Sequence, residues 1–347
     1  MDVRPSPEQI ALRDSTVQVV ERLGPHAVAQ LDDRERAGKL DAAVDASGWR
    51  ELRTAAEDGG PWGSAVEVAI VAEELARGLA DVAFIGPTMA AELRRLSGAP
   101  PATGHETVAL TADLSRPASG MEGLVGSGAL AIDARGATSA LVLAVGPDGH
   151  AIGEAHIGDV AAGADLTRPV ARFGSPATAT AVVGQSRRLD EGDVARWQSL
   201  GLAVASADLV GTMRGTLTLA CDYAKSRRQY GAAIGSFQAV QHLLADALVA
   251  MEGSRSIALQ AAWAVDALPS ADALAAASAA KAYCARAARS VCETSIQVHG
   301  GIGNTWDCLA HVFLRRALLS SDMFGGVGAN LSRVVAARGL GVDHGLR

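Results

Sequence analysis

Two long amphipathic stretches near the C-terminus constrain the fold of this chain more than any other feature. In FQAVQHLLADALVAMEGSRSIALQAAWAVDA, Val240, Leu244 and Ala247 follow at spacings of four and three, the period of a helix buried on one face. The second stretch, SADALAAASAAKAYCARAARSVCETSIQVHGG, is rich in small residues, so neighbouring helices can approach it closely. It ends at Gly300 and Gly301, a strong signal for a helix C-terminus. Together the two stretches predict a helical bundle.

The rest of the chain divides into two parts with different sequence patterns. The N-terminal part has helical periodicity and begins with a capping box, in which Ser6 caps the free amides and Gln9 reaches back. The middle part consists of short segments rich in Val, Thr and Ile, and Pro147-Asp148-Gly149 forms a turn between two of them. We expect an α+β fold with an N-terminal helical domain (1–105), a small, shortened middle β domain (106–186) and a C-terminal four-helix bundle (187–347).

Composition and charge argue against several classes of partner. The net charge of -7 and the pI near 5.6 disfavour nucleic acid and acidic membrane surfaces. Ala, Gly and Asp interrupt every apolar run before the roughly 18 residues that a membrane span requires. The N-terminus has neither a signal core nor transit-peptide character, so we expect a cytoplasmic protein. The four cysteines form no CxxC pair and are expected to be buried, inert thiols.

The stretch YAKSRRQYGAAIGSFQAVQHLLAD, residues 223–246, joins a helix end to a glycine-punctuated turn. Two adjacent arginines, Arg227 and Arg228, end the first helix, and Gln238 lies at the start of the next. At this position the arginines could merely complement the helix dipole. A planar guanidinium beside a glycine turn is equally suited to a pyrophosphate, through paired charge-assisted hydrogen bonds. The residues alone leave both interpretations open.

The second unusual stretch is QVHGGIGNTWD, residues 297–307. Its glycines free the backbone to approach a ligand, but they match neither a phosphate-cradling loop nor the dinucleotide-binding GxGxxG pattern. His299 and His311 flank Cys308, but no fourth ligand for zinc is suggested, so we expect no metal.

These stretches, in this order and spacing, resemble the acyl-CoA dehydrogenase family. DASGWRELRTAAEDGGPWG followed by VAEELARGLADVAF is similar to the N-terminal helical domain of that family, and GADLTRPVARF is similar to the end of its middle β domain. The two signatures above are similar to those of its C-terminal bundle. The resemblance covers most of the chain. It implies FAD, oligomers built from dimers, α,β-desaturation of acyl-CoA thioesters, and an electron-transfer flavoprotein or similar acceptor.

In this family the bundle signatures bind the FAD of the neighbouring subunit. Carried over by position, the resemblance implies that Arg227 pairs with the pyrophosphate and that Gln238 supports the adenosine side. Gln297, Gly300 and Gly301 would contact that side of the same cofactor. A guanidinium offsets phosphate charge, while amides and bare backbone satisfy the remaining acceptors.

Two departures from the family concern the chemistry itself. The mechanism needs a carboxylate to remove the α-proton, and the two positions that normally supply it are occupied here by Gly201 and Gly326. The middle domain lacks the "TEP..GSD"-like loop and the "W-I-[ST]-N" strand that hold the flavin ring and the thioester. The half of a flavin site that a subunit holds for itself therefore looks absent, while the half offered to a neighbour is intact.

This asymmetry predicts a subunit that completes the FAD site of a partner, as in the β-type subunits of the α2β2 acyl-CoA dehydrogenases of actinobacterial steroid and cholesterol catabolism, which the chain resembles. Two alternatives remain. The chain could be a self-sufficient homo-oligomer with an unusually placed base, for which Asp307 and Asp208 are the candidates, or a non-catalytic scaffold that binds a partner without FAD. A dipole contact for Asp307 and a polar packing contact for Asp208 are the plainer interpretations. Glu73 and Glu74 are expected on a solvated face or in a local ion pair.

Overall fold

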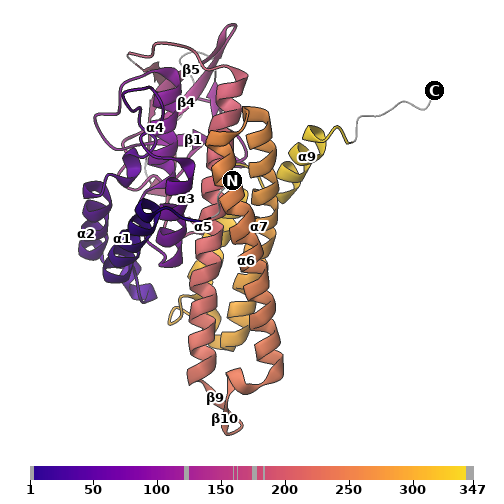
Figure 1. Cartoon of the computed structure of the whole chain (residues 1–347). Coiled ribbons are helices and arrows are strands. Elements are labelled where there is room, and N and C mark those ends of the chain that lie inside the picture. Colours follow the sequence, from indigo (N-terminus) through magenta and orange to yellow (C-terminus); the bar gives the residue numbers. More distant parts are fainter. Residues whose placement is uncertain are drawn as a thin grey trace, which may run out of the picture.

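The computed structural model describes residues 4–120, 125–158, 160–161, 163–173, 178–182 and 184–340. Its elements form three successive groups, helices, then a sheet, then helices (Figure 1). The N-terminal group comprises α1 (Pro7–Leu23), η1 (Val28–Asp32), α2 (Arg34–Ala46), η2 (Trp49–Glu51), α3 (Ala65–Arg77) and α4 (Ile85–Ser97). The strands are β1 (Glu106–Leu110), β2 (Ser119–Gly120), β3 (Leu130–Ala131), β4 (Ser139–Gly146), β5 (Gly149–His156), β6 (Val160–Ala161), β7 (Val170–Arg172) and β8 (Ala179–Ala181).

The C-terminal group contains the longest helices of the molecule. Its elements are α5 (Glu191–Ser226), β9 (Arg228–Gln229), β10 (Ala232–Ala233), η3 (Ile234–Ser236), α6 (Gln238–Ala267), α7 (Ser270–His299), η4 (Gly300–Asn304), α8 (Ala310–Asp322) and α9 (Val327–Ala337). Helices α5, α6, α7 and α8 pack together as the predicted bundle, and α9 adds a fifth helix against α7 (Figure 1). Alanines such as Ala277, Ala280 and Ala288 are fully buried along α7, which explains how its neighbours approach so closely.

Local signals account for where the elements begin and end. The amide of Gln9 donates to Ser6 Oγ at 3.2 Å and the amide of Ser6 donates to Gln9 Oε1 at 3.1 Å, so the predicted capping box is confirmed. The predicted turn before Gly149 is confirmed as well, because β4 and β5 pair antiparallel up to Gly146 and Gly149. Helix α7 ends at His299, where the double glycine predicted its end.

The middle domain is built on one sheet. Within the described residues it has eight strands in the order β6-β7-β3-β1-β4-β5-β8, with β2 paired to β4. Residues of β1 are buried throughout, because one apolar core runs from the N-terminal helices across this sheet to α5. No helix in the described ranges combines the length and the apolarity that a membrane span requires.

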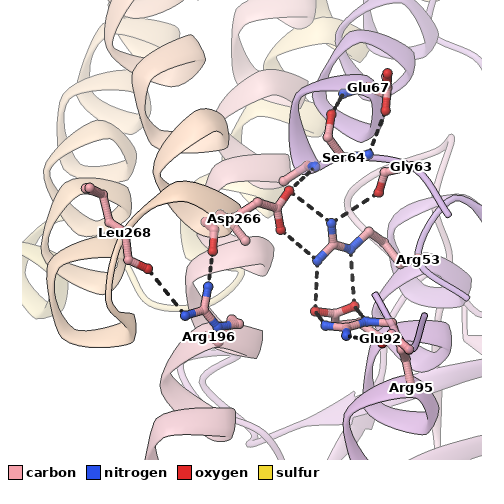
Figure 2. Close-up of polar contacts among 12 residues, drawn as sticks. Arg53, Gly63, Ser64, Glu67, Glu92, Arg95, Arg196, Asp266 and Leu268 are labelled. Atoms are coloured by element: carbon pink, nitrogen blue, oxygen red, sulfur yellow. Dashed lines mark hydrogen bonds and ion pairs between the residues drawn. The ribbon is translucent and has the colours of Figure 1, made fainter. Parts of the chain in front are cut away.

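A buried cluster of charges ties the N-terminal helices to the end of α6 (Figure 2). Arg53 is fully buried and donates through Nε and Nη2 to Glu92 of α4 at 3.1 and 3.0 Å. The same guanidinium donates to both carboxylate oxygens of Asp266 at 3.2 and 3.1 Å. Asp266 also accepts the amide of Ala65, the first residue of α3, at 2.7 Å. Arg53 and Asp266 together therefore join α3 and α4 to the end of α6, which is far from them in the sequence.

Hydrogen bonding keeps this cluster ionised despite its burial. Burial by itself raises the pKa of Glu92, but hydrogen bonds from Arg95 and Arg53 hold that pKa below its ordinary value. The pKa of Arg53 is raised in spite of burial, because Glu92 and Asp266 favour the charged guanidinium. The cluster is therefore a paired network in which no charge is isolated.

Candidate functional site

The two glycine-containing signatures meet at one end of the bundle. Ala220 and Ala224 of α5 are buried against Val298 of α7, and Tyr223 stacks on His299 with ring centroids 4.5 Å apart. The β9–β10 hairpin, η3 and the start of α6 lie at the same end, remote from β4 and β5 (Figure 1). Segments about seventy positions apart therefore form one continuous surface, which we call the bundle-end surface and define by residues 223–244 and 297–307.

Arg227 presents an uncommitted cation on this surface. It caps the C-terminus of α5, where its amide donates to Tyr223 O and its carbonyl accepts from Ile234 N, both at 2.8 Å. Its exposed guanidinium makes no hydrogen bond or ion pair with any described residue, whereas that of Arg228 donates to Gly231 O at 3.2 Å. Of the two adjacent arginines, Arg227 is therefore the one whose guanidinium donors are all available to a ligand.

The other carried-over residues are also exposed on the bundle-end surface. Gln238 is the first residue of α6 and Gln297 lies in the last turn of α7, and neither side-chain amide has a hydrogen-bond partner among the described residues. Gly300 ends α7 at a φ of +65°, a conformation that favours glycine. A Cβ added to Gly300 or Gly301 would meet open space, so the backbone there is accessible to a ligand.

The sequence reasoning missed one aromatic residue of this surface. Tyr230 lies at the tip of the β9–β10 hairpin, is 96% exposed and has a φ of +51°. Its ring contacts Phe237 edge-on at 6.5 Å, so most of the ring surface remains uncovered. A signal was present, since an aromatic residue stands between a basic cluster and a glycine in an otherwise polar turn. A flat, exposed ring beside Arg227 is suited to stacking on a heteroaromatic ligand.

Apolar side chains surround these polar groups. Trp306 is 63% exposed although it is a large hydrophobic residue. Other exposed apolar side chains of this surface are Phe237, Leu243 and Ile302. A patch of this kind beside unpaired donors is typical of an interface with another protein.

The interior position of one expected carboxylate is filled by another side chain. A Cβ at Gly201 would lie 2.6–2.7 Å from three ring atoms of Phe324, which is closer than real contacts allow. Phe324 is 2% exposed and packs edge-on against Trp197 with ring centroids 5.8 Å apart. The space next to α5 at position 201 therefore has no room for a base in this conformation.

A buried lysine lies beneath the turn that contains the second position. Lys281 of α7 is fully buried, and its Nζ donates to Ser321 O at 2.7 Å and to Gly325 O at 3.2 Å. Asn330 Nδ2 donates to Gly325 O at 2.6 Å, and Gly326 caps the start of α9. The turn is thus held by amine and amide donors, and glycine stands where a carboxylate is expected.

Lys281 gives a testable dependence of stability on pH. Burial lowers the pKa of Lys281 to about 7, against the opposing effect of Asp322. The pKa of a lysine in an unfolded chain is about 10.4, so above about pH 7 the unfolded chain binds a proton that the folded chain does not. We therefore expect the free energy of unfolding to rise with pH above about 7, by up to about 1.4 kcal/mol per pH unit from this residue.

The measurement is urea unfolding of the wild type and of Lys281→Met between about pH 7 and pH 8.5. The window ends there because burial raises the pKa of the Cys284 thiol to about 12, which makes stability fall as unfolded thiols ionise at higher pH. The Met variant retains all the other titrating groups, so the difference between the two slopes of unfolding free energy against pH isolates the contribution of Lys281. A wild-type slope no steeper than that of the variant would contradict the expectation.

The structure places the first candidate base, Asp208, in a buried ion-pair network. Asp208 is 1% exposed, and its Oδ1 accepts from Arg316 Nη2 at 2.6 Å and lies 3.3 Å from Arg168 Nη1. Its Oδ2 accepts from Ser320 Oγ at 2.6 Å. Burial by itself raises its pKa, but Arg168 and Arg316 hold the pKa below its ordinary value. This position joins α5, α8 and the loop before β7, and it is typical of a packing residue.

The structure places the second candidate, Asp307, on the bundle-end surface. It is exposed, it lies before the start of α8, and its amide is 3.4 Å from Thr305 Oγ1. Trp306 contacts His311 edge-on at 5.0 Å and lies 5.7 Å from the Arg315 guanidinium carbon. Asp307 is thus exposed whereas Asp208 is buried, and no contact among the described residues joins the two candidates.

One imidazole and one thiol near the glycines, those of His299 and Cys308, pair with each other. His299 is buried, its Nδ1 lies 2.7 Å from Ser295 O, and a hydrogen bond with Cys308 helps raise its pKa although burial by itself lowers it. Among the described residues, no group of three or more His, Cys, Asp or Glu side chains could hold a metal ion. Cys284, Cys292 and Cys308 are buried and Cys221 is partly so, and all four are free thiols.

Comparison with known proteins identifies the family. The model of the acyl-CoA dehydrogenase N-terminal domain matches residues 6–94, and that of the acyl-CoA dehydrogenase C-terminal domain matches residues 201–340. The chain belongs to the acyl-CoA dehydrogenase family of flavoprotein oxidoreductases, as the motifs predicted, and this family typically binds FAD. The described architecture of helices, sheet and helices is the fold of that family.

Among individual proteins, the chain is 32% identical to acyl-CoA dehydrogenase IpdE2 of Mycobacterium tuberculosis over 339 residues, which is 92% of this chain and 93% of IpdE2. It is 37% identical to acyl-CoA dehydrogenase FadE34 of the same organism over 185 residues, 52% of this chain but only 25% of FadE34. The match to FadE34 therefore spans about a quarter of that protein.

Solved structures with the same fold include assemblies of two different subunits. A variant of the Tcur3481–Tcur3483 steroid ACAD matches with a TM-score of 0.81 at 22% identity, over 96% of this chain and 98% of that chain. The ChsE4–ChsE5 complex from Mycobacterium tuberculosis matches with a TM-score of 0.74 at 24% identity, over 98% and 99%. The chain thus shares its fold with the matched chains of these two structures.

Proposed function

We propose that this chain is the FAD-site-completing subunit of a heteromeric, α2β2 acyl-CoA dehydrogenase. The observation that carries the proposal is the contrast between two places in the molecule. At the bundle-end surface, Arg227 and two glutamines offer unpaired donors within an apolar patch. In the interior, Phe324 fills the space beside Gly201 where a base of this chain would stand. The chain thus has donors that can complete a cofactor site, but at position 201 it has no room for the base that catalysis by this chain alone would need.

The bundle-end residues fit the chemistry of FAD. The guanidinium of Arg227 binds the pyrophosphate through paired charge-assisted hydrogen bonds. The amides of Gln238 and Gln297 bind the adenosine side, and Gly300 and Gly301 let the backbone approach it closely. The bound cofactor supplies the acceptor for the hydride removed from the substrate β-carbon. This chain contributes binding and exclusion of water, and the partner contributes the flavin-ring contacts and the carboxylate base.

The proposed reaction is α,β-desaturation of an acyl-CoA thioester, with steroid-derived acyl groups as the substrate class. Support comes from the Tcur3481–Tcur3483 steroid ACAD, which shares this fold, as does the ChsE4–ChsE5 complex. Electrons leave through an electron-transfer flavoprotein or a similar acceptor. The partner of this chain is a second acyl-CoA dehydrogenase subunit, which covers the exposed apolar side chains around Arg227. We place the complex in the cytoplasm.

Co-purification tests the proposal directly. The chain is purified alone and together with an acyl-CoA dehydrogenase encoded next to it, and bound flavin is measured by visible absorbance. We expect a colourless lone chain and a yellow complex with two FAD per heterotetramer, because each site needs both kinds of subunit. Stoichiometric FAD in the lone chain would instead favour a self-sufficient homo-oligomer, and a colourless complex would favour a scaffold without FAD.

Arg227→Ala should weaken FAD binding in the complex on the order of 100-fold, since two charged hydrogen bonds contribute about 1.5 kcal/mol each. Flavin released on dilution is measured by fluorescence, and subunit assembly is followed by gel filtration. Arg228→Ala is the matched control, because its guanidinium donates to Gly231 O within its own hairpin. Equal flavin affinity in the Arg227 variant and the wild type would remove the pyrophosphate assignment.

A further inference from the structure

The structure also contains a cavity that lies away from the bundle-end surface. A cavity of about 930 Å³ opens where α1, α3, α5 and α6 meet, and none of the residues carried over for FAD lines it. Its apolar wall consists of Val66, Ala69, Ile70, Ala207, Ala258, Leu259 and Trp263. A volume of this order is within the range of about 300–1,000 Å³ that is typical of small-molecule sites. The mechanism proposed above does not use it.

Two of the three acidic residues that line this cavity are already paired. Glu73 Oε1 and Glu74 Oε1 accept from Arg214 Nη1 at 2.5 and 2.7 Å, and Glu74 Oε2 accepts from Arg77 Nε at 2.6 Å. Glu74 is 1% exposed, so the sequence-based expectation of a solvated face is wrong and that of an ion pair is confirmed. The remaining carboxylate of the lining, that of Glu252, is exposed. The arginines beneath the wall thus offset its negative charge.

Two arginines of the lining retain free donors. Arg13 of α1 makes one polar contact among the described residues, from Nε to Asp14 Oδ1 at 3.5 Å. Arg255 of α6 has its Nε 3.5 Å from Glu73 Oε1 and forms no hydrogen bond with a described residue. Ser6, the N-cap of α1, and Gln9, in its first turn, line the same cavity, so the positive end of that helix dipole also lies there.

We propose that this cavity binds an amphiphilic carboxylate. An extended apolar body lies against Ile70, Leu259 and Trp263, where it removes apolar surface from water. The carboxylate lies at the rim, where the guanidinium of Arg255 or Arg13 donates paired hydrogen bonds to its two oxygens. The positive rim excludes cationic amphiphiles of the same length. The site is independent of FAD, and it serves ligand binding and no chemistry.

The test is a calorimetric titration of the purified chain with decanoate, and of its complex with the acyl-CoA dehydrogenase partner. We expect saturable binding of one decanoate per chain in both, with quenching of tryptophan fluorescence that disappears in Trp263→Phe. Arg255→Gln should weaken binding about tenfold, the effect of one charged hydrogen bond of about 1.4 kcal/mol. Arg289→Gln is the control, because Arg289 is exposed on α7 and pairs with Glu293.

Three results would overturn the proposal. One is binding of decyltrimethylammonium as tight as that of decanoate, since a positive rim must discriminate between them. Another is unchanged decanoate affinity in the double variant Arg13→Gln/Arg255→Gln, whose exposed side chains can be replaced without loss of the fold. A third is loss of decanoate binding in the complex, which would make the cavity part of a subunit interface. Flavin content plays no part in these readouts, so their failure leaves the proposed function intact.

Discussion

Replacing Arg53 by methionine is expected to lower the free energy of unfolding by about 3–5 kcal/mol, the usual effect of removing one partner from a buried charge network. The side chain is fully buried between Glu92 and Asp266, so the variant leaves the Glu92 carboxylate in a dry environment with Arg95 as its remaining cation. It also frees Asp266, which holds the start of α3 through the amide of Ala65. The N-terminal helices and the bundle should then separate more easily.

Chemical unfolding of the wild type and the variant measures this effect. The control is Arg289→Met, which removes an exposed pair with Glu293 and should change stability by less than about 0.5 kcal/mol. The double variant Arg53→Met/Glu92→Leu should recover only part of the loss, because it removes the under-paired carboxylate but also takes away the partner of Arg95. An Arg53→Met protein as stable as the control would show that the network contributes nothing to the joining of the domains.

Asp208→Asn separates a packing role from a catalytic one. An amide of the same shape cannot neutralise Arg168 and Arg316, which are 2% and 3% exposed, so we expect a loss of about 3–5 kcal/mol in stability. At a temperature where the variant remains folded, dehydrogenase activity of the complex per bound flavin should be unchanged. A general base would give the opposite pattern, with activity reduced about 100-fold or more and stability maintained.

Asp307→Asn is the matched comparison. Its side chain is exposed, so stability should stay within about 0.5 kcal/mol of the wild type. Activity per flavin should also be unchanged, because the proposed base belongs to the partner subunit. A large fall in activity in either variant without loss of folded protein would return the base to this chain and would support the self-sufficient alternative.

Local sequence signals predicted the elements that depend on local chemistry. Ser6 and Gln9 form the expected capping box, and the chain turns before Gly149 as expected. The end of α7 at His299 also follows from its two glycines. In each case the residues that decide the structure are within a few positions of one another, so no knowledge of the tertiary fold was required.

The sequence did not reveal the pairings that depend on the tertiary fold. Arg316 donates to Asp208, about a hundred positions earlier in the chain. Periodicity shows that both residues are on helices but does not show which faces meet. For the same reason Gly201 could be recognised as a missing carboxylate, whereas the filling of its space by Phe324 could not be foreseen.

The packing of Phe324 against position 201 also has an evolutionary consequence. A carboxylate cannot enter at Gly201 first, since even a Cβ would lie 2.6 Å from the ring. Shrinking Phe324 to alanine first would leave a cavity beside Trp197, at a cost of about 3–5 kcal/mol. Each single step toward a base at position 201 therefore passes through a less stable protein. At this position a lineage that has reached the arrangement is held there by the packing of its own core.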